Sequence, residues 1–224
     1  TQSIYADLML AGDLHPCTLV QRMNEVYGII GVKPSLPQMV EAPALADRVL
    51  TESSLRTRLQ GVYQECVLGR NIEAASSLVE LTGEPYQQDP NNLQILYSQV
   101  LMSDSDKGAE VVQFLVSSTG TPPDDQIVQA RYRELFRKYV ETCHSDYGYD
   151  DDESYEDFGE SFLGKIEELE NGTHVTPVFD REFALDCYKH CIVAGEKYYD
   201  KLKTINEYHT LSLDDRREAV TTGI

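Results

Sequence analysis

The amino-acid sequence predicts an all-α protein of about eight or nine helices, arranged as a helical-hairpin array that is either solenoid-like or an irregular bundle. Apolar side chains recur at three- and four-residue intervals through most of the 224 residues, which places them on one face of a helix. Gly, Pro, Asn and Asp interrupt these runs where helices begin and end. No two segments show the alternating pattern of paired strands.

The first expected helix spans residues 19–30. It follows Pro16, a favourable first-turn residue, and Gly31 with Pro34 ends it. Three prolines between Pro34 and Pro43 predict an extended connection, because proline interrupts a helix interior.

Two helical hairpins are expected next. Their helices are predicted over residues 55–67, 72–79, 93–101 and 109–116. Asn71 and Asp106 are suitable caps, and Gly69, Gly83 and Gly120 are suitable ends. Helices joined by such short turns must pack antiparallel, so the pattern predicts a repeated unit.

Two short stretches of this region are typical of a known repeat. Gly69–Ala74 resembles the turn and second-helix start of a tetratricopeptide repeat, and Asp89–Asn92 resembles the end of such a repeat. Ala74 and Ala109 lie 35 residues apart, close to the family period of about 34. The resemblance covers residues 52–122 and implies stacked helix pairs whose concave surface holds protein partners. An ordinary helical bundle with short loops is the alternative.

The remaining chain predicts three more helices and a short terminal one. Long helices are expected over residues 127–143 and 183–202, with a short helix over 162–169 between them. Asp180 is the expected cap of the last of these, and Ser212 to Asp215 resembles a capping box for the short final helix.

Residues 145–159 are rich in Asp, Glu and Tyr, and their like charges oppose compact structure. We therefore expect a helical-hairpin region over residues 1–144, an acidic loop or linker over 145–159, and a carboxy-terminal helical section over 160–224 that packs on the first.

The charge excludes some partners. Nineteen Lys and Arg against 38 Asp and Glu give a net charge of -19, which repels phosphate and anionic lipid. No apolar stretch approaches the ~20 residues that span a bilayer. We expect protein partners, some of them basic, and neither direct nucleic-acid binding nor a membrane.

Five scattered cysteines, an odd number, indicate free thiols in a reducing, cytoplasmic setting. The sequon Asn171-Gly172-Thr173 leaves a secreted origin as the alternative.

Cys187, His190 and Cys191 are the candidate metal ligands, because residues at i, i+3 and i+4 share a helix face and thiolate with imidazole suits zinc. Cys143 and His144 are candidates to complete the shell. Buried thiols beside a surface histidine are the alternative interpretation. The sequence carries none of the common phosphate-loop, dinucleotide, nucleophile-elbow or zinc-protease motifs, and it predicts no cofactor and no catalytic residue.

The acidic run is the candidate partner-binding site. Its residues are Asp150, Asp151, Asp152, Glu153, Tyr155 and Glu156. A calcium-binding EF-hand loop from Asp150 would need Gly at Tyr155 and Glu at Ser161. The partner-binding interpretation is a docking strip for a basic partner, strengthened by phosphorylation of Ser154; a solvated loop and a weak cation site are the alternatives.

The function expected from these observations is a noncatalytic interaction scaffold or adaptor in a larger assembly. One alternative is an acidic inhibitor that imitates nucleic acid and fills a basic groove. A second is a helical metalloprotein or enzyme centred on Cys187, His190 and Cys191. The oligomeric state stays open.

Overall fold

The computed structural model of the chain describes residues 2–41, 51–83, 89–103, 107–141, 153–194 and 199–222; for residues 153–161, 193–194, 199–200 and 222 it describes the backbone alone. Within these ranges there are twelve helices and no strand, so the expected all-α class is confirmed. The chain separates into two compact units, residues 1–121 and 122–224.

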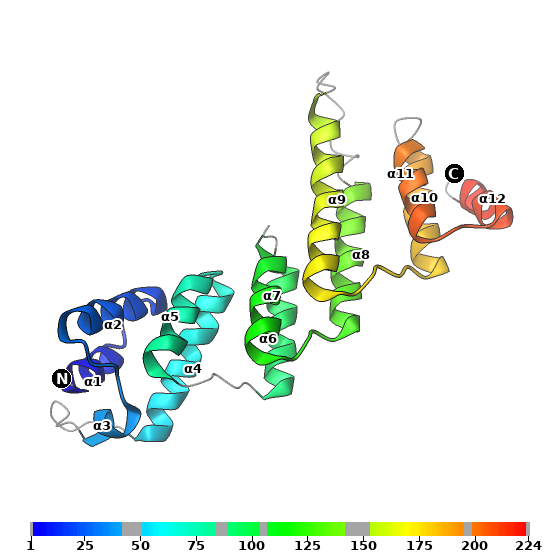
Figure 1. Cartoon of the computed structure of the whole chain (residues 1–224). Helices are drawn as coiled ribbons and strands as arrows, with labels where there is room; N and C mark the ends of the chain where they lie inside the picture. The colour runs from blue at the N-terminus through cyan, green and yellow to red at the C-terminus, as the bar shows by residue number, and fades with distance from the viewer. Residues whose placement is uncertain are drawn as a thin grey trace. The chain divides into compact units, whose positions relative to one another are not determined.

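Two antiparallel hairpins and a group of three helices make up the first unit (Figure 1). Its helices are α1 (Gln2–Leu10), α2 (Pro16–Ile30), α3 (Leu36–Glu41), α4 (Glu52–Leu68), α5 (Ile72–Thr82), α6 (Pro90–Met102) and α7 (Gly108–Thr119). α4 pairs with α5, α6 pairs with α7, and the two first helices, α4 and α6, contact each other. α2 packs against α4 and α5, and α1 and α3 pack against α2 and α4 respectively, so α1–α3 cover one side of the first hairpin.

Local capping explains where these helices begin. Thr51 and Ser54 exchange side-chain and backbone hydrogen bonds in a capping box before α4. The side chain of Asn71 accepts from the Ala74 amide at the start of α5, as the sequence predicted. Because α4 ends at Leu68 and α5 begins at Ile72, only three residues connect them, and the two helices must run antiparallel.

A helix-closing motif recurs at the end of the second helix of three hairpins. It consists of a leucine, a threonine four residues later, and then a residue with positive φ: Leu78, Thr82 and Gly83; Leu115, Thr119 and Gly120; Leu169, Thr173 and His174. In each case the threonine hydroxyl donates to the leucine carbonyl, at 2.7–2.8 Å. The left-handed residue then turns the chain out of the helix.

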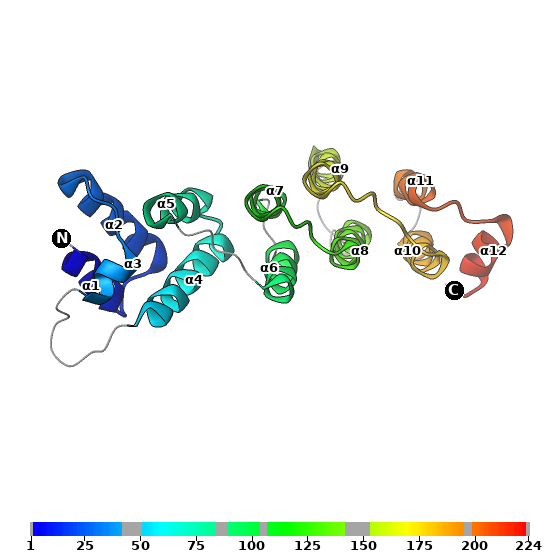
Figure 2. The ribbon, with the colours of Figure 1, turned by 60° about the horizontal axis from the view of Figure 1, so that its bottom comes forward.

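The second unit contains two further hairpins and a terminal helix. Its helices are α8 (Asp125–Glu141), α9 (Glu153–Thr173), α10 (Arg181–Ala194), α11 (Tyr199–Tyr208) and α12 (Leu213–Thr222). α8 pairs with α9 and α10 pairs with α11, as the view along the helices shows (Figure 2). α10 also contacts α8 and α12, so it is the central helix of this unit.

An aromatic cluster forms the core of the second unit. The ring of Phe136 in α8 lies at its centre, with centroid distances of 4.7–6.5 Å to five other rings. Those rings belong to Tyr139, Phe162, Phe179, Phe183 and Tyr208. Because they come from α8, α9, α10, α11 and the segment before α10, one contact region holds four helices together.

The caps expected in this unit are present. Asp180 accepts from the Phe183 amide at 2.8 Å, and Ser212 with Asp215 forms a capping box. Arg181, at the start of α10, donates to Asp215 and Glu218 and so ties α10 to α12.

The described residues contain twelve helices where the sequence predicted eight or nine. α1 has neither a recognisable cap nor a wide apolar face, and it is helical because Tyr5, Ala6 and Met9 are buried. α3 forms despite its proline, because Pro37 stands in the first turn, where a missing N–H costs nothing. The single helix expected over residues 183–202 is instead the pair α10 and α11, which pack against each other.

The division of the chain also differs from the expected one. The first unit ends at Thr121, and α8, which the sequence assigned to the region 1–144, packs with α9 and α10. Within the acidic segment 145–159, the backbone is helical from Glu153 as part of α9. Residues 145–152 lie outside the described residues.

Candidate functional site

The candidate metal ligands of α10 do not converge. Cys187 and Cys191 are buried, with 3% and 0% of their surface exposed, whereas His190 is exposed and its Nδ1 lies 2.9 Å from the Asp186 carbonyl. Burial raises the pKa of both thiols to about 12, so the protonated form dominates at neutral pH. These cysteines therefore contribute to the core.

Within the described residues no group of three or more His, Cys, Asp or Glu side chains is placed to hold a metal ion. Cys143 and His144, the candidates to complete a zinc shell, fall outside those residues.

The acidic partner-binding strip lies mostly beyond what the structure describes. Asp150, Asp151 and Asp152 are outside the described residues, as are the side chains of Glu153, Tyr155 and Glu156. The backbone of the last three belongs to the first turn of α9.

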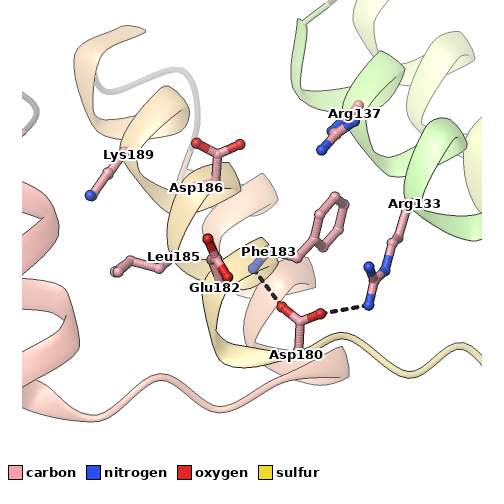
Figure 3. A pocket seen from close by; sticks show the side chains of 8 residues that line it. All are labelled: Arg133, Arg137, Asp180, Glu182, Phe183, Leu185, Asp186 and Lys189. Atoms are coloured by element: carbon pink, nitrogen blue, oxygen red, sulfur yellow. Dashed lines mark hydrogen bonds and ion pairs between the residues drawn. The ribbon is translucent and has the colours of Figure 1, made fainter.

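A different surface of the second unit is hollowed. It is an open groove of about 440 Å³ between α8 and α10 (Figure 3). Its lining residues are Arg133, Arg137, Asp180, Glu182, Phe183, Leu185, Asp186 and Lys189. The groove is formed by the first helices of two adjacent hairpins, so the packing of α8 on α10 determines its width.

One end of the groove is fixed by an ion pair. The guanidinium of Arg133 donates to the carboxylate of Asp180, which also caps α10 through the Phe183 amide. The Phe183 amide contributes most to lowering the pKa of Asp180 below its ordinary value of 3.8, and Arg133 lowers it further. Asp180 therefore joins the start of α10 to α8.

The floor of the groove is aromatic and its α8 wall is cationic. The guanidinium carbons of Arg133 and Arg137 lie 5.7 and 5.6 Å from the centroid of the Phe183 ring, within cation–π range. Arg137 is exposed, and within the described residues no carboxylate lies in ion-pair range of its guanidinium. It therefore offers an available positive charge beside an apolar floor.

The α10 wall has mixed charge. Glu182 and Asp186 are exposed on it, with Lys189 one turn further along. The lining of the groove includes no hydroxyl, thiol or imidazole group; its polar groups are guanidinium, carboxylate and amine, beside the apolar side chains of Phe183 and Leu185. Such a surface can contact a partner through charge and through apolar area.

The sequence did not single out this groove. Arg133 and Arg137 were visible only as the polar face of an amphipathic helix, and their carboxylate and aromatic neighbours are about 45 to 50 residues away. An available signal was the recurrence of a tyrosine eight residues after the aspartate that precedes a helix, in Asp89/Tyr97, Asp124/Tyr132 and Asp180/Tyr188. That recurrence is a sequence similarity among α6, α8 and α10.

The described residues define an all-α protein built from helical hairpins, with a charged groove between α8 and α10. Comparison with protein-family models, curated proteins and solved structures finds no match to this chain. Among the described helices, none combines the length and the apolar composition needed to cross a bilayer.

Proposed function

We propose that this protein is a noncatalytic interaction scaffold or adaptor, and that the groove between α8 and α10 contacts a protein partner. The observation that carries the proposal is the groove itself, an open surface with an available cation, exposed carboxylates and an aromatic floor. Mixed charge around a buried aromatic ring is typical of partner-binding surfaces, where the apolar part supplies affinity and the charges supply selectivity.

The recurrence of the helix-closing motif supports a tandem origin of the hairpins. It closes each of α5, α7 and α9 with the same hydrogen bond, from the threonine hydroxyl to the leucine carbonyl, although only the first two hairpins lie in the region that resembles tetratricopeptide repeats. Tandem hairpins place equivalent helices side by side and so create grooves between them. A tetratricopeptide-like array is therefore the architecture that we propose.

The charges of the groove suggest the chemistry of its partner. A segment with an acidic side chain toward Arg137 and a basic side chain toward Glu182 or Asp186 would be complementary to both walls. The acidic run from Asp150 to Glu156 in the sequence supplies a second contact for a partner that is basic overall. A partner of mixed charge and basic excess fits this proposal.

A charge-reversal pull-down tests the role of the groove. The full chain, its Arg137→Glu variant and an Arg217→Glu control are used as bait in native affinity purification with quantitative mass spectrometry. Arg217 is a suitable control because it is exposed on α12, in the same unit, and pairs only locally with Asp214. We expect proteins enriched by the wild type to fall about tenfold with Arg137→Glu and to persist with Arg217→Glu. Equal retention by all three baits would refute the groove as the contact surface.

An acidic mimic of nucleic acid is a second candidate, favoured by the net charge of -19. Salt distinguishes the two functions, because the Debye length falls from about 10 Å at 0.1 M to about 3 Å at 1 M. A mimic would lose its partner steeply over that range, whereas a groove with an apolar floor would retain most of it.

A further inference from the structure

Two cysteines from different helices of the first unit bring their sulfur atoms into contact. The Sγ atoms of Cys17 in α2 and Cys66 in α4 lie 3.8 Å apart, although the residues are 49 positions apart in the sequence. Both are free thiols in this structure. The contact arises because α2 packs directly on α4.

The two thiols differ in accessibility. Cys17 is half-buried in the first turn of α2, whereas Cys66 is completely buried on the inner face of α4. A reagent in solution can therefore reach Cys17 first. Cys66 is placed to react with the Cys17 sulfur once that sulfur has been oxidised.

The other described cysteines provide a natural comparison. Cys187 and Cys191 are also both buried, but they stand one turn apart on a single helix and their sulfur atoms are not in hydrogen-bonding contact. Neither presents an accessible thiol beside a buried one. Among the described cysteines, only Cys17 and Cys66 combine sulfur contact with access from solvent.

We propose that Cys17 and Cys66 form a reversible oxidation site that closes to a disulfide on reaction with a small disulfide such as oxidised glutathione. In the first step the Cys17 thiolate attacks one glutathione sulfur; the Cys17–glutathione disulfide forms and one glutathione thiolate leaves and is protonated. In the second step the Cys66 thiolate attacks the Cys17 sulfur; the bond between the two protein sulfurs forms and the second glutathione leaves. Two protein thiols are oxidised and one glutathione disulfide is reduced to two thiols.

Closure of the pair would fasten the amino-terminal group α1–α3 to the first hairpin. Burial raises the pKa of the Cys66 thiol, with Cys17 as the next cause, so the second step is the slower one at neutral pH. The glutathione adduct of Cys17 is therefore an observable intermediate. The bond would remove freedom from the unfolded chain over a loop of 49 positions and raise the melting temperature by about 5–10 °C.

The test is a timed reaction of the reduced full chain with oxidised glutathione, quenched by alkylation and mapped with trypsin. Each of the five cysteines falls in a different tryptic peptide: residues 1–22, 59–70, 139–165, 182–189 and 190–197. We expect an adduct on peptide 1–22 first, then a 1–22/59–70 crosslink, with three of the five thiols still free. A link between 182–189 and 190–197 should form at least about tenfold more slowly.

Three variants make the test sharper. Cys17→Ser should abolish both the adduct and the crosslink, Cys66→Ser should stop the reaction at the adduct, and Cys191→Ser should leave the crosslink rate unchanged. Should Cys66→Ser fail to fold, the wild-type peptide map decides the question by itself. An adduct that never converts, or crosslinks that form equally between all cysteine pairs, would overturn the proposal.

Discussion

The hydroxyl of Tyr132 in α8 donates a hydrogen bond of 2.7 Å to the carbonyl of Val175, 43 residues further along the chain. Val175 follows the helix-closing motif of α9, and its own amide donates to the Thr173 hydroxyl. The hairpin of α6 and α7, in the other unit, has an equivalent contact. There the Tyr97 hydroxyl donates to the Thr121 carbonyl at 2.6 Å. In both hairpins a tyrosine of the first helix fastens the exit of the second.

Removal of this hydroxyl should destabilise the second unit. Tyr132→Phe leaves the Val175 carbonyl without its donor at a half-buried position, and we expect a loss of about 1–2 kcal/mol of unfolding free energy. Urea denaturation followed by circular dichroism measures the change.

Tyr188→Phe is the matched control for that variant. Tyr188 stands eight residues after Asp180, as Tyr132 stands eight residues after Asp124, but its hydroxyl makes no hydrogen bond within the described residues. Its loss should cost less than about 0.5 kcal/mol. Equal losses in the two variants would show that removal of a tyrosine hydroxyl, and not the loss of the Val175 bond, sets the cost.

Glycine should be the more stable residue at the left-handed position of the helix-closing motif, both where it is introduced and where it is removed. His174 has φ of 59°, which a side chain disfavours, so His174→Gly should stabilise the protein by about 0.5–1 kcal/mol. Gly120 has φ of 69° and open space where a Cβ would lie, so Gly120→Ala should cost about 1 kcal/mol through the backbone alone. Melting temperatures of both variants test this, and a stabilising Gly120→Ala would contradict it.

Asp180 should contribute stability that depends on pH in the acid range. Its folded-state pKa is below the unfolded value of 3.8, through the Phe183 amide first and then Arg133. The contribution is therefore complete above about pH 4 and is lost as the pH falls through the lower, folded pKa. Asp180→Ala should cost about 1 kcal/mol at pH 7 through loss of the cap. Urea midpoints of wild type and variant should differ at pH 7 and converge near pH 2.

Lys201 should also make stability rise with pH, but in the alkaline range and because burial disfavours its charged form. Burial lowers its pKa to about 8, although its ammonium donates to the Tyr139 carbonyl and lies 4.3 Å from the centre of the Tyr139 ring. Since the unfolded pKa is 10.5, the folded state releases the proton more readily, and wild type should gain stability as pH rises from about 8 to 10.5. Lys201→Met should lack this gain. If the difference in unfolding free energy between wild type and Lys201→Met stayed constant from pH 8 to 10.5, the contact with the Tyr139 ring would offset the effect of burial.

Local signals account for much of the helical content that the sequence predicted. The caps at Asn71 and Asp180 and the capping box of Ser212 and Asp215 are present as expected, because each depends on residues within three positions of one another. The glycine ends at Gly83 and Gly120 are local in the same way, since φ near +66° to +69° is a property of one residue. Such features can be recognised without knowledge of the packing.

Other helices depend on distant partners and were missed for that reason. α1 is helical because Tyr5 and Met9 are buried in the first unit, and the Tyr5 hydroxyl donates to the Val32 carbonyl, 27 residues away. The reversal between α10 and α11 leaves little trace in periodicity, because both helices carry apolar residues on the same spacing. Short helices and reversals of this kind are decided by burial.

The sequence alone determined the all-α class, most helix starts and ends, and a surface of strong negative charge, because these properties depend on residue type and on neighbours within one or two turns. Only the tertiary structure decided that Arg137 faces Phe183 across a groove, that Tyr132 reaches Val175, and that Cys17 touches Cys66. Each of those contacts joins residues more than forty positions apart. The packing of the amphipathic helices brings these residues together, and that packing is set by the combined burial of many side chains.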